Sequence, residues 1–291
     1  MAATDLATLV RRTRRFVGDY RDIDTITASC SSSATSITVA DTSAYSIGEK
    51  IEIEYETMIV RARASGTGLT VARGAYDSTA ATHASGVSVL RPVDFTFAEY
   101  VDALNAAIDS CFPLLYRPVV DESLTAVSGS YEYTVPNMPE ADEGVSVPIP
   151  FISRVYVRVT GDVPFRKLHN NWRVIRGTTP KLVFRSDIND GTVRIEGFGP
   201  FPHLSAPTET LHALFPKRAE RPVLIEYAGQ WLLASGEARR VRGDTSVTDS
   251  REQANRTGSS MAAAGGIYQR ASQALLQLAM PPMPKSVVGT V

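Results

Sequence analysis

Residues able to perform nucleophilic catalysis are few in this sequence and lie far apart. Such chemistry needs a serine or cysteine beside a base, but the chain has no Gly-x-Ser-x-Gly turn and its four histidines share no spacing. The histidines occur in turn-like or proline-rich surroundings, which predicts surface or turn positions for all of them: His83, His169, His203 and His212. We therefore expect no active site of this kind.

The other common catalytic and metal-binding patterns are missing as well. Gly66-Thr67-Gly68 has neither the lysine nor the following helix of a phosphate-binding loop. Cys30 and Cys111 are far apart and lack a Cys-x-x-Cys partner, which excludes the usual zinc, redox and disulfide patterns. Three acidic residues alternate with apolar ones in one segment and are expected on the solvated face of a strand: Glu52, Glu54 and Glu56. The sequence predicts a protein without enzymatic activity, metal or cofactor.

Composition places the chain among globular proteins. Its 291 residues are 43% hydrophobic and 21% charged, enough for one large or two small cores. The 30 basic and 31 acidic residues give a net charge of -1, so no global field draws the chain to nucleic acid or to an anionic membrane. The amino terminus has neither the pattern of a signal peptide nor that of a membrane span. We expect a protein made in a reducing cytoplasm, with any nucleic-acid contact being local.

The first helix is predicted over residues 4 to 18. Its apolar residues recur at spacings of three and four, and Gly18 is a natural end. The opposite face carries a basic cluster that could hold phosphates, although such clusters more commonly form a solvated surface or a protein contact. The cluster is a candidate basic contact patch: Arg11, Arg12, Arg14 and Arg15.

Three further helices follow from the same periodicity. One runs from Phe97 to Cys111 and begins with a capping box of Thr96 and Glu99. Another begins at Pro222 and reaches Val241, with a strand over 223–227 as the competing interpretation. The last continues through Leu278 and is ended by the prolines that follow. Cys111, on the apolar face of its helix, is expected to be a small buried hydrophobic residue.

Two regions between the helices have the period of β-strands. Residues 36–91 contain short alternating strands, among them 51–56, and predict a small inserted β module. Residues 124–198 contain further short strands separated by turn residues, which predicts an antiparallel sandwich or barrel. The turn at 187–191 resembles a calcium loop only superficially, and its Asn-Asp-Gly favours a hairpin. The fold class is therefore α+β.

These elements predict an order of domains along the chain. Residues 1–35 and 92–120 form the first part of a helical frame, 36–91 the inserted module, 121–215 the central β domain and 216–280 the last two helices. Residues 281–291 contain three prolines, Pro281, Pro282 and Pro284, which prevent a helix, and should run as an extended docking tail. Val287, Val288 and Val291 suit a strand added to the sheet edge of a neighbouring protein, with a frayed end as the alternative.

Residues 47–91 resemble a small β module of virion proteins in tailed bacteriophages. A strand with Glu-x-Met-x-Val is followed there by a Leu-Thr-Val-x-Arg-Gly strand and a Thr-Ala-Ala-x-His-x-x-Gly turn. The matching positions are Glu56, Met58, Val60, Leu69 to Gly74, Thr79 to His83, and Gly86. The motif occurs in tail, fibre and neck proteins alike.

The order of helices around this module looks like the frame of head-to-tail adaptor (connector) proteins. That resemblance implies a structural virion protein of the neck, assembled in the host cytoplasm into a dodecameric ring under the portal. Its partners would be the portal protein, the next neck or tail protein and copies of itself. DNA would pass through the channel without specific contacts, and no membrane would be involved. The alternatives are a tail or fibre-associated protein with β domains that bind host-surface carbohydrate, and a cell-wall hydrolase, for which the required residues are missing.

Overall fold

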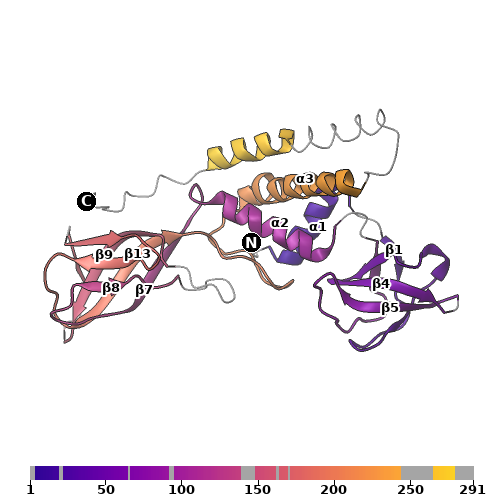
Figure 1. The fold of residues 1–291 in the computed structure, drawn as a ribbon, viewed down its shortest axis with the longest axis horizontal. Coiled ribbons are helices and arrows are strands. Elements are labelled where there is room, and N and C mark those ends of the chain that lie inside the picture. Colours follow the sequence, from indigo (N-terminus) through magenta and orange to yellow (C-terminus); the bar gives the residue numbers. More distant parts are fainter. Residues whose placement is uncertain are drawn as a thin grey trace. The chain divides into compact units, whose positions relative to one another are not determined.

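The computed structural model describes residues 4–19, 22–64, 66–91, 95–138, 148–161, 164–169, 171–243 and 265–278. Within these residues the chain forms four helices, a curled six-stranded antiparallel sheet and two smaller antiparallel sheets (Figure 1). This confirms the predicted α+β class. The described residues form two compact units: the first lies within Met1–Ala107, Leu204–Ala213 and Lys217–Ala274, and the second comprises the rest.

Helices α1 (Leu6–Val17) and α2 (Phe97–Cys111) begin and end as their sequences predict. The Asp5 carboxylate caps α1 by accepting a hydrogen bond from the Thr8 N–H at 2.8 Å, and Gly18 ends it with a φ of 78°. At the start of α2, the Thr96 N–H donates to Glu99 at 2.7 Å, one half of the predicted capping box. Both helices bury one apolar stripe.

The carboxy-terminal helical region begins with a 3-10 turn, η2 (Lys217–Ala219), and a π-helix, η3 (Glu220–Ile225), which lead into α3 (Glu226–Gly243). The competing strand interpretation of 223–227 is therefore wrong. A further helix covers residues 265–278, drawn yellow in Figure 1, and contacts α3 through side chains. The Tyr227 hydroxyl lies 2.8 Å from the Ser272 hydroxyl, and Trp231 of α3 is 41% exposed.

The six-stranded sheet has the order β1-β6-β3-β4-β5-β2. Its strands are β1 (Asp22–Thr25), β2 (Ser36–Thr38), β3 (Lys50–Ile53), β4 (Glu56–Arg63), β5 (Gly68–Ala75) and β6 (Ser88–Leu90), with a 3-10 turn η1 at Thr42–Ala44. Its side chains enclose one hydrophobic core that includes Val39, Tyr45, Met58 and Leu69. The sheet, α1 and the first residues of α2 belong to the same compact unit.

The predicted continuous strand over 51–56 is wrong in one respect. Glu54 and Tyr55 form a tight turn between β3 and β4, and Glu54 has a φ of 57°. Because the turn reverses the chain, the alternation of exposed acidic residues fails: Glu52 is 0% and Glu56 is 1% exposed. Buried carboxylates need partners, which the functional site supplies.

The second unit contains two sheets, with orders β10-β9-β13-β7 and β11-β12-β8. One core joins both sheets and includes Val155, Trp172, Leu182 and Val193, as expected for a sandwich. The strands are β7 (Arg117–Ala126), β8 (Glu132–Thr134), β9 (Phe151–Val159), β10 (Arg166–Lys167), β11 (Trp172–Ile175), β12 (Lys181–Phe184) and β13 (Gly191–Gly199).

The hairpin predicted at 187–191 is wrong, because β12 and β13 lie in different sheets. Asp187 and Asp190 instead accept hydrogen bonds from a neighbouring turn: the Gly129 N–H donates to Asp187 at 2.8 Å and the Ser128 N–H to Asp190 at 2.7 Å. The two carboxylates therefore fix the connection between sheets. In the described part of the chain, no helix is both long and apolar enough to cross a membrane.

Candidate functional site

The six-stranded sheet contains a buried ion network centred on Glu56, the first residue of β4. Arg73 of β5 binds this carboxylate with two parallel bonds, Nε to Oε1 and Nη2 to Oε2, both 2.7 Å long. The Gly74 and Ala81 N–H groups donate to the same carboxylate at 3.0 and 2.9 Å. Arg73 also donates to the carbonyl oxygens of Ser31 and Ala34. The network therefore holds the loops that contain Ser31, Ala34 and Ala81 to one buried charge.

His83 completes the network. Its Nδ1 lies 2.7 Å from Glu54 Oε2 and its Nε2 lies 3.0 Å from Glu56 Oε2. A neutral imidazole has one N–H, so only the doubly protonated ring donates to both carboxylates. The histidine is 0% exposed and pairs with Cys30 in an isolated β-bridge, so the predicted surface or turn position is wrong. The ring connects the exposed β3–β4 turn to the buried carboxylate.

The hydrogen bonds determine the protonation state of Glu56. Burial raises the pKa of its carboxyl group, but the bonds from Arg73, the Ala81 N–H, His83 and the Gly74 N–H outweigh burial and lower the pKa to about 2. The group is therefore charged throughout the physiological pH range. Both oxygens of the carboxylate hold hydrogen bonds from groups of the chain itself, which gives this charge a structural role.

The glutamate, the arginine and the histidine of the motifs in residues 47–91 are members of this network. Glu56, Arg73 and His83 are joined directly, although 17 and 27 residues separate the arginine and the histidine from the glutamate. Gly74 has a φ of 57°, and a Cβ there would lie 3.1 Å from the Ser78 carbonyl oxygen. These three polar positions of the motif therefore form one buried cluster.

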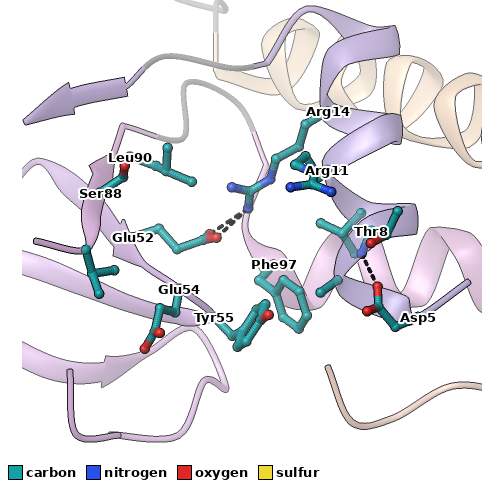
Figure 2. A pocket seen from close by; sticks show the side chains of 13 residues that line it. Asp5, Thr8, Arg11, Arg14, Glu52, Glu54, Tyr55, Ser88, Leu90 and Phe97 are labelled. Carbon is teal, nitrogen blue, oxygen red and sulfur yellow. Dashed lines mark hydrogen bonds and ion pairs between the residues drawn. The ribbon is translucent and has the colours of Figure 1, made fainter. Parts of the chain in front are cut away.

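A second buried ion pair joins α1 to the sheet. Arg14 Nη2 lies 2.6 and 2.7 Å from the two oxygens of Glu52, and the side chains are 5% and 0% exposed (Figure 2). The Arg14 guanidinium also lies 5.0 Å from the centre of the Tyr100 ring, whose hydroxyl donates to Asp19 at 2.9 Å. Burial raises the pKa of Glu52, while Arg14 and the Phe97 N–H oppose that effect. Three elements, α1, β3 and α2, therefore meet at one polar contact.

A cavity of about 560 Å³ opens beside this pair. Figure 2 shows the side chains of its lining, among them the Arg14–Glu52 pair, Asp5, Arg11 and Tyr55. A second cavity, of about 380 Å³, has some lining residues in common with the first. Its lining also includes Glu56 and His83 of the ion network and the acidic residues Asp77 and Asp102. Residues common to both cavities are Glu54, Tyr55 and Phe97, the last two with ring centres 4.9 Å apart.

A third cavity, of about 460 Å³, is the basic groove, lined by Arg12, Arg15, Phe16, Arg221 and Ile225. Arg12 donates from Nη1 to Glu220 at 3.1 Å. Glu220 is 6% exposed and is held from the other side by the Thr4 hydroxyl at 2.8 Å. The lining contains three arginines and two apolar residues, and the arginine on one side is fixed by a buried carboxylate.

The structure divides the predicted basic patch into three parts. Arg11 lines the first cavity, Arg14 is buried against Glu52, and Arg12 and Arg15 line the basic groove. The prediction that these residues form one surface is therefore wrong, because α1 turns Arg14 towards the sheet. Arg221, which the sequence did not single out, joins the groove from the π-helix. The predicted docking residues Val287, Val288 and Val291 lie outside the described residues.

Both cysteine thiols are buried. Burial raises the pKa of the Cys111 thiol to about 12, and Cys30 is 7% exposed. Among the described residues, no group of three or more His, Cys, Asp or Glu side chains is arranged to hold a metal ion. A comparison with models of known protein families gives no match, and a comparison with curated proteins gives none either.

Proposed function

We propose that the chain is a structural virion protein of a tailed bacteriophage, a head-to-tail adaptor that forms a ring under the portal. The observation that carries the proposal is the Glu56–Arg73–His83 cluster. In this cluster, Arg73 and His83 form hydrogen bonds to the Glu56 carboxylate within the protein. The role of these motif residues is therefore to stabilise the fold of the β module. The partners are the portal, the next neck or tail protein and further copies of the chain.

The link between α1 and the β module supports this role. Arg14 and Glu52 are both buried, and removing either partner would leave an uncompensated charge. A subunit that transmits load between head and tail benefits from such a fixed junction, because the helix and the sheet then move together. The carboxy-terminal tail of residues 281–291 would attach this unit to a neighbouring sheet edge.

Binding to the portal tests the proposal. Purified chain is mixed with portal rings, and co-sedimentation is measured together with the symmetry of the complexes in electron micrographs. We expect saturable binding and a ring on one face of the portal. A chain that stays in the supernatant under assembly conditions contradicts the adaptor role. The same experiment without portal gives the background of self-sedimentation.

A tail or fibre-associated protein that binds host-surface carbohydrate is the second candidate. The second cavity favours it, because aromatic and carboxylate side chains, including Tyr55 and Asp102, line it and match the apolar face and the hydroxyl groups of a sugar. Cell-wall oligosaccharides of the host should then raise the Tm of the native chain but not of a Tyr55→Ala, Asp102→Ala variant. An unchanged Tm at millimolar sugar contradicts this candidate.

A further inference from the structure

The charged cavities of the first unit have opposite chemistry. All three charged residues that line the basic groove are arginines, and two apolar side chains complete the lining. The second cavity is lined by the carboxylates of Glu54, Asp77 and Asp102, in addition to the buried Glu56 and His83. We call the first three the acidic rim. Each of them is exposed, the Glu54 side chain to 43%.

We infer that the basic groove receives the acidic rim of a second copy of the chain. This inference deepens the proposed function and rests on it, because a ring requires a contact between two different surfaces of neighbouring subunits. The groove and the rim share no residue. One copy can therefore use both surfaces at the same time, one towards each neighbour.

The composition of the groove favours a protein partner. Arginine and aromatic side chains are enriched at protein interfaces, where guanidinium groups bind carboxylates with two hydrogen bonds and apolar residues exclude water. Phe16 provides the aromatic residue and Ile225 the aliphatic one. The Phe16 ring lies against Gly229 of α3, where an added Cβ would come within 2.6 Å of the ring. The position of this ring in the lining is therefore fixed by close packing.

A nucleic acid fits this groove less well. Its affinity depends on the number of phosphates that basic groups neutralise. The groove offers three arginines, and one of them already lies 3.1 Å from the buried Glu220. The whole chain has a net charge of -1 and adds no attraction at long range. Carboxylates on a complementary protein surface are the better match.

Sedimentation velocity tests this contact through charge exchange. The groove variant is Arg15→Glu, Arg221→Glu, and the rim variant is Asp77→Asn, Asp102→Lys. Asn is chosen at 77 because this residue has a φ of 60°, which Asn tolerates. A control, Arg61→Glu, Arg63→Glu, makes the same charge change as the groove variant at two exposed residues elsewhere in the unit. Circular dichroism verifies that all variants retain the native helix content.

The weight-average sedimentation coefficient of the native chain should rise with protein concentration at about 50 mM salt. The rise should be smaller at about 500 mM salt, because salt screens exposed charges. Each variant alone should associate at least tenfold more weakly. An equimolar mixture of the two variants should associate again, because the rim variant retains the native groove and the groove variant retains the native rim. The control should associate like the native chain.

Three results would overturn the inference: a native chain that is monomeric up to about 1 mM, a groove variant that associates normally, or a mixture that does not regain association. A labelled DNA duplex distinguishes the alternative ligand. If the groove variant loses DNA binding but keeps self-association, the groove binds nucleic acid and the inference is wrong. Portal co-sedimentation of the native chain, measured separately, reports on the adaptor role and does not depend on the groove.

Discussion

At the scale of single residues, the main finding is that the Glu56 carboxylate of the β module is both buried and charged. Glu56 has its pKa lowered to about 2 by Arg73, the Ala81 N–H, His83 and the Gly74 N–H, against the opposing effect of burial. Its unfolded value is near 4.5. The stability that this group contributes is therefore fully present above pH 4.5 and is lost as the pH falls from 4.5 towards 2.

Glu56→Gln should reduce the free energy of unfolding at pH 7 and flatten its decline in acid. Removing the carboxylate leaves Arg73 and His83 without their buried partner, which costs about 3–5 kcal/mol. The acid-dependent part of the native stability should be on the order of 3 kcal/mol. Urea unfolding between pH 2 and 7 measures both quantities. The control is Glu122→Gln, since Glu122 is a half-exposed partner of Arg194, and it should change the free energy of unfolding little. If the free energy of unfolding depends on pH in the same way for Glu56→Gln and Glu122→Gln, the prediction is contradicted.

The thiol of Cys111 should be unreactive in the native protein. With a pKa of about 12, the fraction of thiolate at pH 8 is on the order of 10⁻⁴, and the side chain is buried. In a Cys30→Ala background, a thiol reagent should label Cys111 only when urea unfolds the chain. Rapid labelling in native buffer would show that the helix carrying this residue opens easily.

At the scale of elements, the contact between α1 and β3 depends on one ion pair. Arg14→Met should lower the free energy of unfolding by about 3–5 kcal/mol, because it leaves the Glu52 carboxylate buried and unpaired. Arg14→Met, Glu52→Met should recover most of that loss, since both charges are then gone. Chemical denaturation of the single and double variants gives the coupling energy directly. Arg11→Met, an exposed residue on the same helix, should stay within about 0.5 kcal/mol of the native chain.

The helices could be predicted from the sequence because their signals are local. The cap at Asp5, the end at Gly18 and the capping box at Thr96 and Glu99 each involve residues within a few positions of one another. The turn at Glu54 and Tyr55 could not, because it contains none of the usual turn residues and forms only when β3 and β4 pair.

The partners of the buried carboxylates also lay beyond sequence reasoning. Arg14 is 38 residues from Glu52, and His83 is 27 residues from Glu56. Strict alternation indicates which residues share a face of a strand, but it does not tell whether another element covers that face. The basic patch was misassigned for the same reason, since packing of α1 against the sheet selects Arg14 for burial.

At the scale of the whole molecule, the sequence predicts that the carboxy-terminal tail attaches the chain to its neighbours. Truncation after Met280 should leave the unfolding free energy within about 0.5 kcal/mol of the native value, while co-sedimentation with portal rings is lost. In assembly reactions it should give DNA-filled heads without tails. A second, full-length variant carries Val287→Asp, Val288→Asp. It should lose portal co-sedimentation in the same way as the truncated chain. Tailed, infectious particles at normal yield from the truncated chain would contradict the docking role.

The two tryptophans of the chain give the molecule a pair of intrinsic fluorophores, one for each compact unit. Trp172 is buried in the sandwich core and donates its indole N–H to the Leu168 carbonyl oxygen, whereas Trp231 on α3 is 41% exposed. An indole in an apolar core and one in contact with water differ in polarity and therefore in emission wavelength. Replacing either by Phe should leave a spectrum that reports on one unit alone, so that the order in which the units melt can be followed without any external label.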